Sequence, residues 1–404
     1  MKHVIIGAGA AGISAARTIR QNGSDEIVII STDDAVISRC MLHKYISGSR
    51  NVAELSFIPY NFFEQNNISW RRGTVVTSID TAAKRVNFDG GNESYDRLLI
   101  ATGAESVLPP IDGLKGTKSV YGLRHLSDAK AIRDFAKLAT NIVIIGAGLV
   151  GLDAAYGLVE MGRKPTVVEM AATVLPQNMD KHAASTYETK FTEAGCKFML
   201  NSWVESVQVN SSGAVSGITL DGGKQMPCDL LIVAVGVRPA IEFAKNSGIE
   251  CGRGITVDDY FASSAPDVYA AGDATGLSES WPDAKRQGEL AALNMCGIQT
   301  PYNDALVQKN TVNFFGVPTL SVGRPLPIDG DNEESRCDYS AYQKIILRDG
   351  VPVGVILQGD ISRSGIWHHM IKTKRDISKI PKSIWKISFA DAYGLDEDGE
   401  YTWI

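Results

Sequence analysis

The stretch KHVIIGAGAAGISAARTIR, residues 2–20, reads as an apolar strand, a glycine-rich turn and an alanine-rich helix. Its three glycines, Gly7, Gly9 and Gly12, stand in GxGxxG spacing. The first glycine permits a tight turn, the second lets the backbone approach a pyrophosphate, and the third lets helix and strand pack closely. The N-terminus of the helix then faces the anion. We therefore expect a dinucleotide-binding unit at the start of the chain.

The same pattern returns at residues 141–170, NIVIIGAGLVGLDAAYGLVEMGRKPTVVEM. Gly146, Gly148 and Gly151 repeat the spacing, and the strand that follows ends in Glu169. Two copies imply two dinucleotides. A carboxylate at this strand end can accept hydrogen bonds from both hydroxyls of an adenosine ribose, whereas it would repel a 2′-phosphate. Because no arginine follows Glu169 directly, the pattern predicts NADH in preference to NADPH.

The first copy departs from this pattern at its second strand. IVIIS ends in Ser31, and Thr32 and Asp33 follow, where an acid is expected for the ribose. Either Asp33 reaches the ribose from further along the chain, or Ser31 and Thr32 bind it more weakly. Both interpretations stay open.

Composition and charge exclude several classes of protein. The chain has 404 residues, 44% of them hydrophobic and 21% charged, which suits two or three globular domains. A formal net charge of -6 argues against a nucleic-acid binder. Six cysteines form no CxxC pair and no metal-ligand spacing, so we expect no metal site and no disulfide framework. With no signal-peptide pattern and no run of about 18 apolar residues, we expect a cytoplasmic protein without a membrane span.

Over nearly its full length the chain resembles the FAD-dependent pyridine nucleotide-disulfide oxidoreductases. YDRLLIATGA at 95–104 resembles the strand and turn that return the chain to the FAD domain, and CDLLIVAVGVRP at 228–239 resembles the exit from the NAD domain. GITVDDYFASSAPDVYAAGDA at 254–274 resembles the second FAD fingerprint, and VTSID at 76–80 the segment beside the adenine. The resemblance implies an α/β fold with two Rossmann-like domains and a C-terminal α+β interface domain.

The resemblance also implies how the domains follow one another. Residues 1–115 and 246–305 would form the FAD-binding domain, and residues 116–245 an NAD-binding domain inserted between them. Residues 306–404 would form the interface domain, which often mediates dimers in the family. We therefore expect a homodimer or a component of a larger complex.

The family's motifs carry binding roles onto this chain residue by residue. Asp273 would hydrogen-bond the ribityl chain of FAD, and Gly272 would let the flavin approach. The full set expected to bind the two cofactors, FAD and NADH, is Gly7, Gly9, Ala11, Gly12, Ser31, Thr32, Asp33, Arg39, Lys44, Val76, Ala101, Thr102, Gly103, Gly272, Asp273, Trp281, Gly146, Gly148, Leu149, Val150, Gly151, Glu169 and Gly236.

The stretch SRCMLHKYISG, residues 38–48, resembles two branches of the family at once. The dithiol branch is excluded, because its CxxxxC pair and its C-terminal His-Pro base are missing. The single-cysteine branch, with a CxLPYxxGG-like stretch, would make Cys40 a redox sulfur. The ferredoxin and rubredoxin reductase branch has an RPxLSK-like stretch, to which Arg39, Leu42 and Lys44 correspond.

In the reductase branch the lysine pairs with an acid of the helix after the second glycine motif, and that acid would be Asp153 here. A lysine at this place stabilises the negative charge that develops on a reduced flavin. Trp281 also matches a tryptophan that this branch holds near the flavin. NTVNFFGVPTLSVG at 310–323 instead looks like the nitrite reductase and NADH oxidase pattern.

These matches predict an enzyme that takes electrons from NADH through FAD to a protein acceptor, either an iron-sulfur carrier or a partner subunit. Lys44, Asp153 and Cys40 are the candidate catalytic residues. The first alternative is an NADH oxidase, or a reductase of coenzyme A disulfide or polysulfide, that works through Cys40. A second alternative, an idle flavoprotein scaffold, is disfavoured by the intact NADH motif with Glu169.

Overall fold

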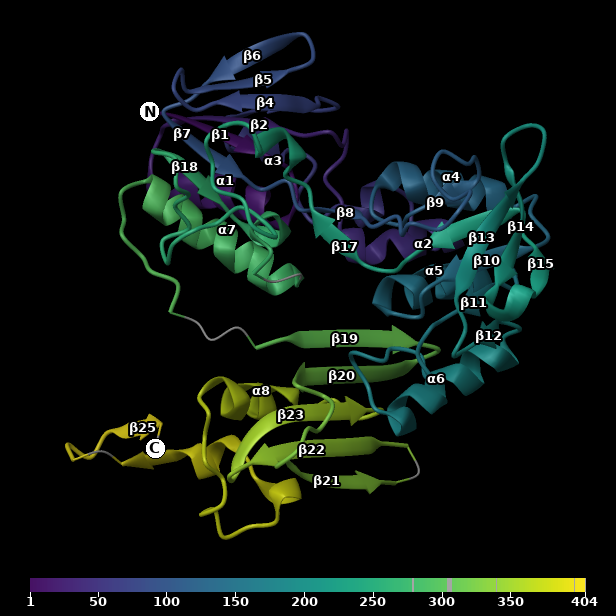
Figure 1. The fold of residues 1–404 in the computed structure, drawn as a ribbon. Coiled ribbons are helices and arrows are strands. Elements are labelled where there is room, and N and C mark those ends of the chain that lie inside the picture. The colour runs from purple at the N-terminus through teal and green to yellow at the C-terminus, as the bar shows by residue number, and fades with distance from the viewer. Residues whose placement is uncertain (278–279, 304–306, 339, 396, 404) are drawn as a thin grey trace. The chain divides into compact units, whose positions relative to one another are not determined.

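A computed structural model describes residues 1–277, 280–303, 307–338, 340–395 and 397–403. The chain divides into two compact units, which Figure 1 draws as a ribbon. The N-terminal unit holds Met1–Ala172 and Phe191–Asp304, and the C-terminal unit holds Thr173–Lys190 and Ala305–Ile404. Both expected dinucleotide domains thus fall within one unit, and the finer domain boundaries stay a prediction.

The first sheet of the N-terminal unit is built from five parallel strands in the order β18-β7-β1-β2-β3. Successive residues of β1 point to opposite faces, as strand geometry requires: Ile5 joins one buried cluster, and Val4 and Ile6 join another. The strands are β1 (Lys2–Ile6), β2 (Glu26–Ile30), β3 (Ile68–Arg71), β7 (Arg97–Ile100) and β18 (Val268–Ala270).

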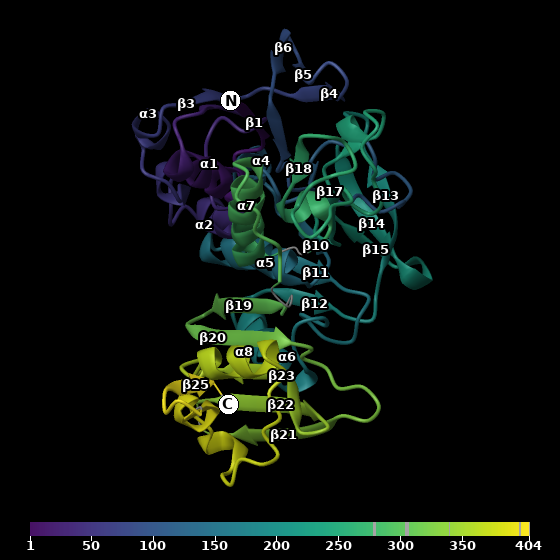
Figure 2. The same cartoon turned by 90° about the vertical axis from the view of Figure 1, so that its left-hand side faces the viewer.

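Two helices cover one face of this sheet, and a small antiparallel sheet covers the other. The helices α1 (Ala10–Asn22) and α7 (Trp281–Met295) lie side by side (Figures 1 and 2). Their contact is close because Gly288 has no side chain: a Cβ there would lie 2.2 Å from the backbone oxygen of Ala11. The antiparallel strands are β4 (Val76–Asp80), β5 (Arg85–Phe88) and β6 (Gly91–Ser94).

The second parallel sheet has the order β12-β11-β10-β16-β9. An antiparallel sheet packs on one face through a shared apolar cluster, and the helices α4 and α5 contact β16 and β10. The elements are β9 (Val120–Tyr121), α4 (Leu126–Ala136), β10 (Ile142–Ile145), α5 (Leu149–Glu160), β11 (Thr166–Val168), β12 (Lys197–Met199), β13 (Val204–Val209), β14 (Val215–Leu220), β15 (Gln225–Pro227) and β16 (Leu230–Val233).

The connections between the two parallel sheets pair with each other. β8 (Ala104–Ser106) follows β7, β17 (Val237–Pro239) follows β16, and the two strands are antiparallel neighbours. Short helical segments complete both units: α2 (Leu42–Ser47), α3 (Phe62–Gln65), η1 (Arg39–Met41), η2 (Ala53–Leu55), η3 (Asp221–Gly223), η4 (Glu242–Ala244), η5 (Gly272–Thr275), η6 (Ile384–Lys386) and η7 (Phe389–Ala392).

The C-terminal unit is an antiparallel sheet in the order β19-β20-β23-β22-β21, with α8 (Ser364–Lys372) packed on it. Trp367 of α8 is only 1% exposed and anchors the apolar cluster between helix and sheet. The strands are β19 (Lys309–Phe314), β20 (Val317–Gly323), β21 (Asn332–Cys337), β22 (Tyr342–Arg348), β23 (Val351–Gln358), β24 (Tyr393–Leu395) and β25 (Tyr401–Trp403).

Most of the helix α6 (Lys181–Glu193) also belongs to the C-terminal unit. Polar contacts join it to the sheet: the Tyr187 hydroxyl donates to the backbone oxygen of Val317 at 2.7 Å, and Gln358 Nε2 donates to that of Ala183 at 3.0 Å. The two parallel sheets and this α+β unit confirm the predicted fold class.

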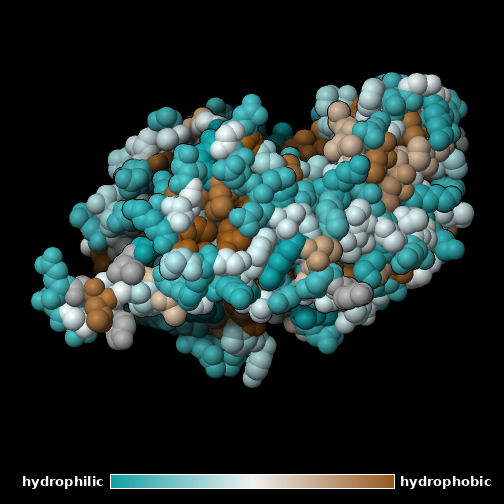
Figure 3. All heavy atoms as spheres, turned by 90° about the horizontal axis from the view of Figure 1, so that it is seen from below, coloured by the Kyte–Doolittle hydropathy of each residue, from teal (hydrophilic) through white to brown (hydrophobic). Residues whose placement is uncertain are grey.

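On the face seen in Figure 3, hydrophilic residues predominate.

Over the described part of the chain, no helix has both the length and the apolar composition needed to cross a membrane.

The α1–α7 contact gives a stability prediction. We expect Gly288→Ala to lower the free energy of unfolding by about 1–3 kcal/mol, because the new Cβ meets backbone and not a movable side chain. The matched control is Gly23→Ala, where a Cβ has no atom within 4 Å and φ is 175°. Thermal unfolding of both variants measures the effect, and equal midpoints would refute the claim that the close contact is required.

Candidate active site

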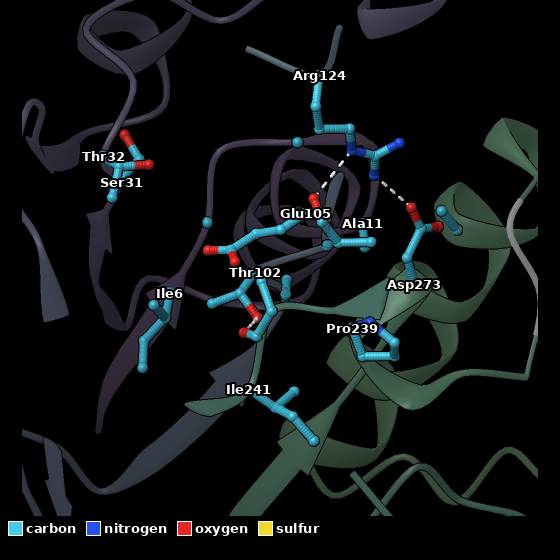
Figure 4. Close-up of a pocket in the computed structure, with 18 of the residues that line it drawn as sticks. Ile6, Ala11, Ser31, Thr32, Thr102, Glu105, Arg124, Pro239, Ile241 and Asp273 are labelled. Carbon is cyan, nitrogen blue, oxygen red and sulfur yellow. Dashed lines mark hydrogen bonds and ion pairs between the residues drawn. The ribbon is translucent and has the colours of Figure 1, made fainter. Parts of the chain in front are cut away.

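A cavity of about 460 Å³ opens in the N-terminal unit beyond the carboxyl ends of β1, β2, β7 and β18 (Figure 4). This is the edge of an open parallel sheet at which such folds bind ligands. The sequence-predicted residues that line it are Gly7, Gly9, Ala11, Ser31, Thr32, Asp33, Arg39, Cys40, Val76, Ala101, Thr102, Gly103, Gly272, Asp273 and Trp281.

The three glycines of the first turn have different surroundings. A Cβ at Gly7 would lie 2.2 Å from the backbone oxygen of Ala101, and one at Gly12 would lie 1.9 Å from that of Gly7. At Gly9 a Cβ would meet no atom within 4 Å. Gly7 and Gly12 are therefore required by packing, whereas Gly9 borders open space at the N-terminus of α1. That space and the helix dipole fit the pyrophosphate of FAD.

The second FAD fingerprint faces the same cavity from β18 and η5. Gly272 has φ +73° and donates its N–H to Gln287 Oε1 at 2.8 Å, which fixes the turn before Asp273. The Arg124 guanidinium contacts the Asp273 carboxylate, and its Nε donates to the backbone oxygen of Ala104 at 3.0 Å (Figure 4). Asp273 is thus held in place at the cavity wall, where its assignment to FAD stays a prediction.

A second ion pair lies at the end of β2. Arg39 Nη2 is 2.7 Å from Asp33 Oδ2, and His125 Nδ1 is 3.4 Å from Asp33 Oδ1. Burial alone would raise the pKa of Asp33, but the hydrogen bond with His125 and the charge of Arg39 outweigh burial and lower it. Ser31 Oγ in turn donates to the backbone oxygen of Asp33 at 2.9 Å. Binding of the FAD ribose by Asp33, or by Ser31 and Thr32, stays a prediction.

The sequence did not single out several charged residues of the cavity. Arg124 and His125 precede α4, in a segment that matched no motif used above, so only the fold brings them to the cavity. Arg238 lies in the stretch at 228–239, in which only Gly236 was assigned a binding role. The unpredicted charged lining residues are Glu105, Arg124, His125, Arg238, Glu242, Lys245 and Arg253.

Cys40 faces the cavity from η1 and is exposed in this structure. The protein atoms packed around the thiol raise its pKa, the charge of Asp153 raises it further, and the charge of Arg124 opposes both. A redox or nucleophilic cysteine works as a thiolate and needs a lowered pKa. The surroundings of Cys40 therefore favour the neutral thiol.

Lys44 and Asp153 each meet a partner other than the one expected. The Lys44 ammonium lies 3.2 Å from Glu160 Oε1 and 4.8 Å from the centre of the Tyr156 ring. Asp153 Oδ1 instead lies 3.5 Å from Nδ1 of His43. Burial raises the pKa of Asp153, and the charge of Lys44 opposes that rise. The structure thus couples the two residues electrostatically but forms no direct ion pair between them.

The second glycine turn repeats the geometry of the first. A Cβ at Gly146 would lie 2.5 Å from the backbone oxygen of Ala234, and one at Gly151 would lie 2.0 Å from that of Gly146, whereas one at Gly148 would meet nothing within 4 Å. Leu149 and Val150 begin α5 directly after Gly148, and Gly236 has φ +128° with open space around it.

Glu169 is held beside this turn by two backbone groups. Its Oε2 accepts from Ala147 N–H at 2.7 Å, and its Oε1 accepts from Ala171 N–H at 2.8 Å. The carboxylate therefore stays next to the turn, where the ribose of a dinucleotide is expected.

Comparisons with known proteins identify the family. Residues 1–288 match the family model described as pyridine nucleotide-disulphide oxidoreductase. The epsilon subunit of the NADH-dependent phenylglyoxylate dehydrogenase of Aromatoleum evansii is 32% identical over 395 residues, 94% of this chain and 93% of that protein. The rubredoxin-NAD(+) reductase of Pseudomonas putida is 31% identical over 315 residues, 74% and 81% of the two chains. An NAD-dependent persulfide reductase from A. fulgidus has a similar structure, with a TM-score of 0.84 at 26% identity over 93% of this chain and 78% of that one.

The chain belongs to the pyridine nucleotide-disulphide oxidoreductase family. It is an FAD-dependent NADH oxidoreductase, with FAD and NADH as its cofactors. The open space at Gly9 and Gly148, each at the N-terminus of a helix, fits the two dinucleotides that the family uses.

Glu169 gives a prediction about the nicotinamide cofactor. We expect kcat/KM for NADH to exceed that for NADPH by at least about tenfold, or about 1.4 kcal/mol, because the carboxylate repels a 2′-phosphate. Glu169→Ala should narrow the ratio, and Glu169→Gln, which removes the charge but keeps an acceptor oxygen, should narrow it less. Steady-state kinetics with both cofactors measures this, and equal efficiency in the unmodified enzyme would contradict the role of Glu169.

Proposed function

We propose that this enzyme passes electrons from NADH through FAD to a protein acceptor, either a small iron-sulfur carrier or a partner subunit. The observation that carries the proposal is the environment of Cys40, where packed protein atoms and the charge of Asp153 raise the pKa of the thiol. A thiol that is kept protonated is a poor redox relay, so the electrons are expected to leave without using it.

The relatives support the same acceptor class. By their names, one is a subunit of an NADH-dependent dehydrogenase, and another is a rubredoxin-NAD(+) reductase. We infer from these names that the chain works beside a redox protein, either as a component of a larger assembly or as a homodimer that meets a carrier. We also place it in the cytoplasm, because all six cysteines are free thiols, as a reducing compartment would keep them.

The chain's own residues supply binding, orientation and charge. When bound, FAD accepts a hydride from NADH and can release the two electrons singly, which suits one-electron protein carriers. The N-terminus of α1 at Gly9 would hold its pyrophosphate, and the Arg124–Asp273 pair would support the part of the wall formed by η5. Trp281 lines the cavity at the start of α7 and packs edge-on against Phe57, with ring centres 4.6 Å apart.

A second candidate function is reduction of a persulfide or disulfide through Cys40. The exposed position of Cys40 on the cavity wall favours it, as does the similarity to the persulfide reductase. In that case the sulfur would attack the substrate as a thiolate, and the residues around it would have to lower its pKa. Instead, the packed protein atoms and the charge of Asp153 shift the pKa of Cys40 upward.

Substitution of Cys40 separates the two functions. We expect Cys40→Ser to leave NADH-dependent reduction of an iron-sulfur carrier within about twofold, or about 0.4 kcal/mol, because the thiol takes no part. The control is Cys337→Ser, which removes another exposed thiol on β21. Steady-state turnover with a carrier and with glutathione persulfide measures both functions. Loss of turnover with every acceptor in Cys40→Ser alone, with FAD still reduced by NADH, would overturn the proposal in favour of the second candidate.

A further inference from the structure

The contact between α2 and α5 places one buried imidazole opposite one carboxylate. The helices approach closely because α5 has glycine at 157, where a Cβ would lie 2.7 Å from the backbone oxygen of His43. This contact brings His43 Nδ1 to 3.5 Å from Asp153 Oδ1. The His43 side chain is 11% exposed and the Asp153 side chain 28%. Among the described residues, the buried Nδ1 has no hydrogen-bond partner.

We propose that Nδ1 of His43 and Oδ1 of Asp153 hold one proton between them, and that this neutral pair keeps an uncompensated carboxylate away from the site that receives the hydride. The proposal rests on the proposed function, because it names the group that sets the charge of that site. Asp153 carries the charge change, and His43 is a positioning residue that acts through it.

The geometry supports the shared proton in two ways. A buried polar atom without a partner is costly, so Nδ1 and the facing carboxyl oxygen each gain from a hydrogen bond. The observed separation exceeds a normal hydrogen bond by only a few tenths of an ångström, and such contacts often tighten when a ligand closes the site.

The pKa shifts of the two groups favour one proton on the pair, held by the carboxyl group of Asp153. Burial raises the pKa of Asp153 to about 8, with the charge of Lys44 opposing. Burial lowers the pKa of His43 to about 4, and the charge of Lys44 lowers it further, whereas that of Glu160 opposes. At neutral pH the imidazole is therefore uncharged and the carboxyl group keeps its proton. As the pH rises through 8, the proton leaves and a negative charge appears on Asp153.

The charge of Lys44 offsets the Asp153 carboxylate charge only in part. Lys44 is engaged by Glu160 within the same contact between helices, and from α4 Arg133 lies over the Tyr45 ring at 5.1 Å. The charge of the Asp153 carboxylate also acts on Cys40, because it raises the pKa of the thiol. The charged groups whose fields reach His43 are Lys44, Glu160 and Arg50, the backbone of Cys40 hydrogen-bonds to its ring, and the Tyr156 ring centre lies 6.3 Å from that of His43.

The protonation state of Asp153 should affect the rate of reduction by NADH. Hydride transfer brings negative charge into the site, and a nearby carboxylate disfavours that step, whereas a neutral carboxyl group does not. Reduction by NADH should therefore be fastest below the pH at which Asp153 ionises and should slow above it.

The first test needs no turnover. The FAD-bound enzyme is labelled with ¹⁵N-histidine, and the Nδ1 shift of His43 is followed between about pH 6 and pH 10, with assignment by His43→Gln. We expect a transition centred near 8, set by Asp153, and its loss in Asp153→Asn. A His43 shift that stays constant over this range, or a transition that persists in Asp153→Asn, would overturn the shared proton.

The second test follows the rate of FAD reduction by NADH in stopped flow over the same pH range. We expect the unmodified enzyme to slow at least about fivefold between pH 7 and pH 9.5, and Asp153→Asn to lose this dependence. His43→Gln should shift the midpoint of the decline. The matched control is Asp25→Asn, which breaks another carboxylate–imidazole contact, Asp25 Oδ2 with His3 Nε2 at 2.9 Å, and should keep the decline.

The outcomes of the second test separate two failures. An undiminished alkaline decline in Asp153→Asn would refute the role of the pair. No reduction by NADH at any pH would refute the proposed function, and the ¹⁵N titration would then decide the pair by itself.

Discussion

The close approach of backbone to backbone at the glycine turns is the constraint on which the rest of the site depends. A side chain at Gly7 or Gly12 would overlap a carbonyl oxygen, and the same holds at Gly146 and Gly151. Because these contacts bring each helix tightly against its strand, the helix N-terminus ends beside the carboxyl edge of a parallel sheet. The dinucleotide sites are therefore consequences of packing, since the space at Gly9 and Gly148 exists only where the other glycines hold the turn.

Ion pairs are the second feature that organises the site. Around the FAD cavity, Arg39 and Arg124 each pair with an acid, Asp33 and Asp273, so the cavity wall carries fixed charges that do not depend on a ligand. On the α2–α5 side the arrangement differs, because Lys44 is balanced by Glu160 and Asp153 faces a neutral imidazole. We propose that the first group of charges serves FAD binding. We propose that the second group acts where electrons enter, and that the protonation of Asp153 sets the local charge there.

The sequence was informative wherever function depends on local spacing. The glycine turns, the acid that follows β11, and the Asp273 fingerprint are short motifs whose geometry follows from neighbouring residues, and the predicted α/β class was correct. Arg124 and His125 escaped prediction because they reach the cavity only through the fold. The sequence also did not predict Glu160 as the partner of Lys44, because this pairing depends on the register in which α2 packs along α5. That register is set by Gly157 against the backbone of His43, a contact that no spacing within either segment reveals.

The central claim is that electrons leave the FAD of this enzyme toward a protein carrier and not through Cys40. The most direct measurement is a single-turnover experiment, in which enzyme reduced anaerobically by one equivalent of NADH is mixed in stopped flow with rubredoxin, with a [2Fe–2S] ferredoxin, or with glutathione persulfide. We predict that a protein carrier reoxidises the flavin faster than the persulfide does. Rapid reoxidation by persulfide, with both protein carriers inert, would contradict the account.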